Sequence, residues 1–170
     1  AQGQTRGPES LQDLGRQEAM GLASAWLPGR MQHIPPCASR PAILLDGAHN
    51  KHAFKALFHS LGSQGITPGA AIFACLGDKD PKEILPILRG IGSGPGYVPH
   101  IQDNPRAMAP LTQASLVGPQ AIPVRSMREA VDKASANMRG KHPDSFTAET
   151  KTPLLICGSL YLLGQFFALY

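Results

Sequence analysis

Three short polar segments carry the side chains of this chain that could do chemistry. Each follows an apolar run and precedes an expected helix: residues 46–50 (DGAHN), 77–80 (GDKD) and 158–161 (GSLY). Together they supply carboxylates, an imidazole, an ammonium group and a hydroxyl, which can hold or neutralise the polar groups of a small molecule. One such segment is common in proteins, but three of them indicate a candidate binding site.

The first segment contains the most informative residues. Asp46 would end a buried strand, where a carboxylate is costly unless a ribose diol, a basic group or the following turn of backbone pairs with it. His49 could donate to a phosphate or transfer a proton, although the local pattern favours a helix-start histidine that is bonded to the backbone. Asn50 occupies the position of an ordinary helix N-cap.

The other two segments each offer one candidate with a plainer alternative. Lys79, between two acids, could neutralise a phosphate or a carboxylate, or it could lie in a solvated loop. Ser159 opens a helix, where free N–H groups and the helix dipole attract anions, but it could equally serve as a simple cap. The histidines nearest Asp46 in the sequence lack the spacing of metal ligands, so we expect no metal site among them.

Several well-known motifs are absent from the sequence. It contains no GxxxxGK[ST] loop for a triphosphate and no GxSxG turn for a serine nucleophile. The glycine-rich stretch at residues 90–96 precedes an expected strand instead of following one, and its spacing does not fit the dinucleotide fingerprint GxGxxG. The sequence therefore does not predict a self-sufficient triphosphate or dinucleotide site.

The elements that must position the three segments alternate regularly. Strands are expected at residues 31–34, 42–46, 70–76, 97–101, 121–124 and 154–157, and helices at 11–25, 50–61, 81–88, 106–116, 127–138 and 160–169. This alternation predicts an α/β fold, a doubly wound, Rossmann-like and mostly parallel sheet with helices on both faces. The first strand has too short a connection for a crossover, so it should be an antiparallel edge. Ligands of such sheets bind beyond the carboxyl ends of the strands, where all three segments lie.

Composition narrows the class of partner and the compartment. The chain has 170 residues and a net charge of +4, but its 16 Lys and Arg are scattered, which argues against a nucleic-acid partner. No apolar run reaches the length of a membrane span. Of the three cysteines, Cys75 and Cys157 lie in apolar runs and form no CxxC pair, which favours a reducing, cytoplasmic location. We therefore expect a small-molecule partner and no membrane.

Four motifs occurring in one order carry a family resemblance. They are WLPGR at residues 26–30, DGAHN at 46–50, GDKD at 77–80 and GSLYL at 158–162. From about Gly21 to the end, the chain resembles the C-terminal part of the folylpolyglutamate synthase/dihydrofolate synthase family of the Mur ligase superfamily. The resemblance assigns residues 1–25 to a tail and a helix from the end of a central domain or linker, and 26–170 to a Mur ligase C-terminal-type domain. Lys51 departs from the proline that is common in the family.

The resemblance implies part of an ATP- and Mg²⁺-dependent amide ligase. Such enzymes phosphorylate a carboxylate of a folate or of dihydropteroate, and the amino group of L-glutamate then displaces phosphate from the acyl phosphate. The phosphate loop, the metal ligands and the folate pocket belong to a covalently linked central domain, so this chain alone should be inactive. Either activity of the family, or both, fits the resemblance.

The resemblance also implies roles for particular residues. Asp46 should hold the ribose, and His49 and Asn50 should lie close to the nucleotide. Arg30 should reach toward the phosphates, with Arg30 and His49 supporting catalysis. The substrate L-glutamate should lie near the remaining candidates, which are Lys79, Asp80 and Ser159. The alternative from another class is a stand-alone Rossmann-like module that binds a nucleotide or metabolite, and a peptidoglycan-building Mur ligase would match residues 26–30 and 158–162 poorly.

Overall fold

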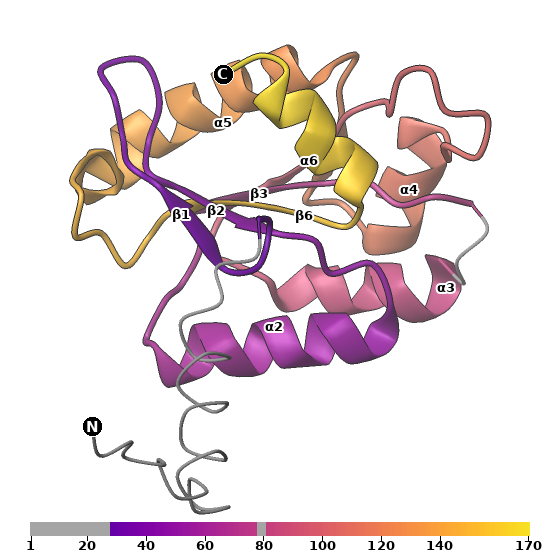
Figure 1. Cartoon of the computed structure of the whole chain (residues 1–170), viewed down its shortest axis with the longest axis horizontal. Coiled ribbons are helices and arrows are strands. Elements are labelled where there is room, and N and C mark those ends of the chain that lie inside the picture. The colour runs from indigo at the N-terminus through magenta and orange to yellow at the C-terminus, as the bar shows by residue number, and fades with distance from the viewer. Residues whose placement is uncertain (1–27, 78–80) are drawn as a thin grey trace, which may run out of the picture.

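The computed structural model describes residues 28–77 and 81–170, which form one six-stranded sheet flanked by helices (Figure 1). The strands are β1 (Gln32–Ile34), β2 (Ile43–Asp46), β3 (Ala70–Phe73), β4 (Gly96–Val98), β5 (Ala121–Pro123) and β6 (Leu154–Cys157). Their order across the sheet is β1-β2-β6-β3-β4-β5. Only the β1–β2 pair is antiparallel among the pairs of this sheet, so the expected antiparallel edge strand is confirmed.

The three central strands end at the same level. Every residue of β2, β3 and β6 is buried, as expected for parallel strands covered on both faces. In the register of the sheet, Cys157 of β6 lies beside Asp46 of β2 on one side and Phe73 of β3 on the other. The loops that follow these strands therefore all start at the carboxyl ends of the strands, which brings together residues that are far apart in the sequence.

Helices cover both faces of the sheet. They are α2 (Lys51–Ser63), α3 (Pro81–Ile84), α4 (Pro110–Val117), α5 (Met127–Lys141) and α6 (Leu160–Phe167), with 3₁₀ turns η1 (Leu85–Gly90) and η2 (Pro143–Phe146). One apolar cluster joins α5 and α6 to one face of the sheet, and a second joins α2, α3 and α4 to the other. Figure 1 shows α5 and α6 on one side of the sheet and α2 and α3 on the opposite side. The predicted doubly wound fold is confirmed.

Several expected elements differ from the structure in their bounds; among the strands, the one expected over 70–76 ends at Phe73 and the one expected over 97–101 ends at Val98. The helix expected over 106–116 begins only at Pro110, because the residues before it form a turn instead. The helix expected over 81–88 changes to a 3₁₀ turn at Leu85, since Pro86 lacks the N–H group that a continuing α-helix requires. The helix expected over 127–138 continues to Lys141, and the short turn η2 follows it. The helix expected at 11–25 and the candidates Lys79 and Asp80 lie outside the described residues.

The glycine-rich stretch has a packing role at the opposite end of the sheet. A Cβ atom on Gly92 or Gly94 would overlap the carbonyl oxygen of Pro68 or Gly69, so these glycines let two backbone segments pack directly together. Both segments directly precede strands, β3 and β4, so they lie at the amino ends of the strands, opposite the polar segments. In the part of the chain that the structure describes, no helix has the length and apolar character needed to cross a membrane.

Candidate functional site

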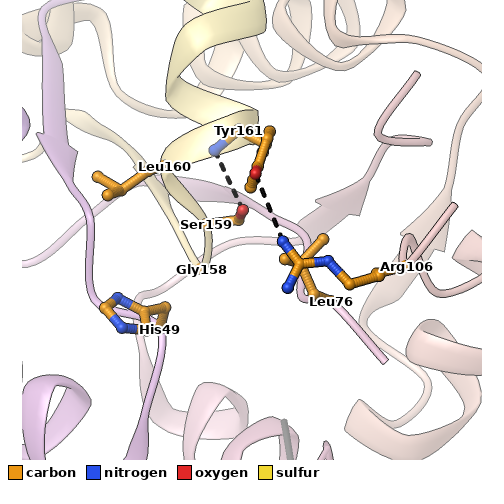
Figure 2. A pocket seen from close by; sticks show the side chains of 7 residues that line it. All are labelled: His49, Leu76, Arg106, Gly158, Ser159, Leu160 and Tyr161. Carbon is orange, nitrogen blue, oxygen red and sulfur yellow. Dashed lines mark hydrogen bonds between the residues drawn. The ribbon is translucent and has the colours of Figure 1, made fainter. Parts of the chain in front are cut away.

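A pocket of about 180 Å³ lies beyond the carboxyl ends of the central strands (Figure 2). Its lining residues come from the loops after β2, β3, β4 and β6 and from the first turn of α6, and they are His49, Leu76, Arg106, Gly158, Ser159, Leu160 and Tyr161. The pocket thus brings together the first and third polar segments of the sequence. The second segment adjoins it through Leu76, which immediately precedes Gly77.

Gly158 allows the floor of the pocket to form. Its φ of +110° is a backbone conformation that L side chains rarely adopt. A Cβ atom at this position would also lie 2.7 Å from the carbonyl oxygen of Ala74, just after β3. Glycine therefore permits both the sharp turn from β6 into α6 and the close approach of that turn to the end of β3.

Ser159 lines the pocket and caps helix α6. Its side chain is buried, with 3% exposure, and its Oγ accepts a hydrogen bond of 3.2 Å from the backbone N–H of Tyr161. The capping role considered from the sequence is therefore observed. Because Ser159 also borders the pocket, the hydroxyl and the amino end of α6 lie where an anionic group could approach them.

His49 lines the pocket and uses one ring nitrogen to hold the local backbone. Its Nδ1 lies 2.9 Å from the carbonyl oxygen of Gly47. A carbonyl can only accept, so Nδ1 carries the proton of this bond. The neutral ring then has Nε2 as an acceptor, and the protonated ring has it as a second donor. The side chain is therefore anchored to the backbone while it lines the pocket (Figure 2).

Asp46 uses both carboxylate oxygens to hold the backbone. Oδ1 accepts from the N–H of Ala48 at 2.8 Å, and Oδ2 accepts from the N–H of Met31 at 3.0 Å. With 6% exposure, the buried carboxylate is stabilised by these two donors. Of the alternatives that the sequence left open, the structure thus shows the one in which Asp46 holds the following turn, while contact with a ribose stays a prediction.

The same loop is fastened to the segment that carries Arg30. The N–H of Gly47 donates to the carbonyl oxygen of Gly29 at 2.6 Å, and the N–H of Gly29 donates to the Gln32 side chain at 2.9 Å. Arg30 is exposed and does not line the pocket. Its backbone is nevertheless held on both sides, so its position beside the DGAHN loop is defined.

Asn50 and Lys51 act at the start of helix α2. The Asn50 side chain accepts a hydrogen bond of 2.9 Å from the N–H of Ala53, which is the N-cap arrangement expected from the sequence. Lys51, at the position where the resembling family commonly has proline, forms an exposed ion pair of 3.3 Å with Glu83. Neither residue lines the pocket, so contact of Asn50 with a nucleotide stays a prediction.

Sequence reasoning missed Arg106, which contributes a guanidinium group to the pocket. Its Nη2 donates to the Tyr161 hydroxyl oxygen at 3.4 Å, and its backbone carbonyl accepts from Gly77 at 2.7 Å. The residue was assigned to a helix, although Asn104 and Pro105 before it are strong turn formers. The Asn104 side chain indeed accepts from the N–H of Arg106 at 3.0 Å, so this turn signal could have revealed the loop.

The two buried cysteines beside the site are not candidate nucleophiles. Burial raises the pKa of the Cys75 thiol to about 12. Burial also raises the pKa of the Cys157 thiol well above its ordinary value, with further contributions from Cys75 and Asp46. A thiol must ionise to attack or to bind a metal, so both side chains behave as small apolar groups. Among residues 28–77 and 81–170, no group of three His, Cys, Asp or Glu could hold a metal ion.

Comparison with known proteins adds a family match. The family model described as "Mur ligase, glutamate ligase domain" matches residues 29–146. Folylpolyglutamate synthase of Lacticaseibacillus casei is 30% identical over 142 residues, which are 84% of this chain and 29% of that protein.

Two solved structures share the fold. Mycobacterium tuberculosis folylpolyglutamate synthase complexed with ADP and AMPPCP gives a TM-score of 0.73 at 25% identity, over 91% of this chain and 35% of that one. The bifunctional folylpolyglutamate synthase/dihydrofolate synthase of Yersinia pestis with Mn, AMPPNP and L-glutamate bound gives 0.62 at 25% identity, over 86% and 32%. The chain spans roughly a third of each relative.

Proposed function

Because the chain belongs to the Mur ligase family through its glutamate ligase domain, we propose that it is part of an ATP-dependent enzyme that joins L-glutamate to a folate or to dihydropteroate. The observation that carries the proposal is the strand-end pocket, in which an arginine, a histidine and a helix-capping serine meet. Folylpolyglutamate synthases are the relatives with the same fold, and one of them was solved with a nucleotide analogue and L-glutamate bound.

The pocket suits an anionic amino acid. Arg106 can form paired hydrogen bonds to a carboxylate, and Ser159 lies at the amino end of α6, where the helix dipole favours negative charge. In the proposed reaction, a folate carboxylate oxygen attacks the γ-phosphorus of ATP, and ADP leaves. The glutamate nitrogen then attacks the acyl carbon and loses a proton as inorganic phosphate departs, so that an amide forms. Arg106 would orient the incoming glutamate for this attack.

His49 is proposed to act on the phosphate side of the same pocket. Its Nδ1 is held by Gly47, so Nε2 is presented in a fixed direction and, when protonated, can donate to a phosphate oxygen. Arg30, Asp46 and Asn50 are proposed to contact the nucleotide, and Lys79 and Asp80 the glutamate. The described residues suit anions and not a divalent metal, so Mg²⁺ would be held with ATP by the remainder of the enzyme.

We also propose the domain division and the location. Residues 1–25 would be the end of a central ATPase domain or its linker, and 26–170 the domain that completes the site. Because no GxxxxGK[ST] loop occurs in this sequence, the chain alone should not cleave ATP. The two buried, unpaired thiols suit the cytoplasm, where cysteines stay reduced.

A domain exchange tests the proposal directly. The matching part of the Lacticaseibacillus casei enzyme is replaced by this chain, and ADP release that depends on folate and glutamate is measured together with product formation. We expect ligation by the hybrid enzyme and none by the isolated chain. The proposal would be wrong if a folded hybrid that still binds folate made no product, or if the isolated chain released ADP in step with product.

A further inference from the structure

A buried glutamine connects two of the loops that form the pocket. Gln113 of α4 has 0% exposure. Its Oε1 accepts a hydrogen bond of 2.8 Å from the backbone N–H of Cys75, and its Nε2 donates to the carbonyl oxygen of Met108 at 2.9 Å. One side-chain amide therefore bonds to the segment after β3 and to the segment after β4, using both its acceptor and a donor.

The two segments joined by Gln113 also pair with each other. The N–H of Gly77 donates to the carbonyl oxygen of Arg106, and Leu76 forms an isolated antiparallel bridge with Ala107. The amide of Gln113 extends this pairing by one further bond, to Cys75. Two of the residues in this small ladder, Leu76 and Arg106, line the pocket. The ladder therefore sets where the guanidinium of Arg106 stands relative to the loop after β3.

An apolar residue would fill the same space without the cost of desolvating an amide. The neighbouring buried residues of α4, Ala114 and Val117, are apolar and pack against the core. At Gln113 an apolar side chain would leave the buried N–H of Cys75 and the carbonyl of Met108 without this partner. Gln113 thus fixes a distance between two loops in addition to filling volume.

We propose that Gln113 is a positioning residue, which holds Arg106 at the pocket and thereby sets the affinity for the carboxylate of the amino-acid substrate. The identity of that ligand rests on the proposed function, whereas the positioning of Arg106 does not. Gln113 acts through the backbone of the loop and touches no substrate itself. Its effect should therefore be seen first in the environment of Arg106.

The test uses the contact between Arg106 and Tyr161 as a ligand-independent reporter. The Arg106 guanidinium carbon lies 5.9 Å from the centre of the Tyr161 ring, so we expect the ring to shift the NMR signals of the arginine side-chain protons. Tyr161→Leu gives the unshifted reference. Gln113→Met removes both amide bonds at similar size, and Gln113→Glu keeps an acceptor for Cys75. Ser145→Ala is the matched control. It too removes a hydrogen bond between a buried side chain and the backbone, from the Ser145 hydroxyl to the carbonyl oxygen of Thr152, but near the amino ends of the strands and away from the pocket.

We expect Gln113→Met to move the Arg106 signals most of the way to the Tyr161→Leu values, and to weaken binding of L-glutamate about tenfold. Gln113→Glu should change the Arg106 signals less. Ser145→Ala should leave them unchanged, even if it lowers the melting temperature as much as Gln113→Met does. Unchanged Arg106 signals in a folded Gln113→Met chain would overturn the inference. Failure of the unmodified chain to bind L-glutamate would instead count against the proposed function, and the Arg106 signals would still decide the role of Gln113.

Discussion

Arg106 and Tyr161, 55 residues apart in the sequence, meet at the pocket, where the guanidinium Nη2 donates to the tyrosine hydroxyl at 3.4 Å. The contact links the loop after β4 to the first turn of α6 (Figure 2). Tyr161 is 54% exposed, and Arg106 itself is exposed. The arginine is consequently oriented yet accessible, which is the arrangement that an anion-binding side chain requires.

Replacement of Arg106 should weaken the binding of anionic ligands. We expect Arg106→Ala to raise the dissociation constant for L-glutamate at least about tenfold, since a charge-assisted pair of hydrogen bonds is lost. Arg106→Lys should recover part of the affinity, because it keeps the charge but not the paired geometry. Calorimetric titration of the folded variants measures both values. Arg125→Ala, at an exposed arginine outside the pocket lining, is the control, and an equal loss there would point to net charge as the cause.

Asp46→Asn should destabilise the fold as well as alter the site. In the aspartate, one oxygen accepts from the N–H of Ala48 and the other from the N–H of Met31. In asparagine an NH₂ group replaces one of these oxygens and cannot accept, so one of the two N–H groups loses its partner. A buried N–H group without a partner costs about 1–3 kcal/mol, and the free energy of unfolding in urea should fall by that amount. Asp132→Asn, at an exposed position on α5, should change it by less than about 0.5 kcal/mol. Equal stabilities of the two variants would show that the Asp46 bonds contribute little.

Two glycines of the last strand–helix unit should respond oppositely to alanine. Gly158→Ala places a Cβ atom against the carbonyl oxygen of Ala74 and forces an alanine to φ +110°, so we expect a loss of about 1–3 kcal/mol. Gly164 lies within α6 with no atom within 4 Å of an added Cβ. Gly164→Ala should therefore stabilise the chain by up to about 1 kcal/mol, through the better helix propensity of alanine. Thermal unfolding of both variants tests this, and a neutral Gly158→Ala would contradict the assigned close packing.

The three thiols should differ in reactivity. Cys37 is exposed, and hydrogen bonds from Ser39 hold the pKa of its thiol below the ordinary value, so iodoacetamide should label it rapidly near neutral pH. Cys75 and Cys157 should react only when the chain unfolds. Mass spectrometry of the labelled native chain would show one adduct, and early labelling at Cys157 would contradict its burial.

The raised pKa of Cys75 also predicts a pH dependence of stability. In the unfolded chain the thiol ionises near pH 9, whereas in the folded chain it stays protonated until about pH 12. Between these values the unfolded state binds fewer protons, so stability should fall as pH rises. Cys75→Ala should make this fall shallower, as measured by urea unfolding at pH 8 and pH 10. An unchanged slope would show that other groups dominate.

Regular alternation made most of the fold predictable. Apolar runs such as Ile43–Leu45 predict buried parallel strands, and the carboxyl ends of these strands indicate His49 and Ser159 as site residues. Helix N-caps were equally predictable, because Asn50 and Ser159 accept hydrogen bonds from N–H groups in the first turns of their own helices. Such local physics can be read from a single sequence.

Long-range bonds could not be predicted in this way. The partners of Asp46 include Met31, 15 positions earlier, and those of Gln113 include Cys75, 38 positions earlier. The turn at Asn104 could be read from the sequence, but the pairing of the Arg106 loop with Gly77, which brings Arg106 to the site, could not. The choice between a ligand contact and a backbone contact for a polar side chain thus depends on which segments tertiary packing brings together.

Two hydrogen bonds, from the N–H of Gly47 to Gly29 and from the N–H of Met31 to Asp46, hold the segment at Gly29 and Met31 directly against the loop that carries His49. Because these bonds join the residues on both sides of Arg30 to the loop that carries His49, we expect a shift of that segment to move His49 with it. In the proposed ligase, a movement of this segment would therefore reposition the wall of the pocket that His49 forms.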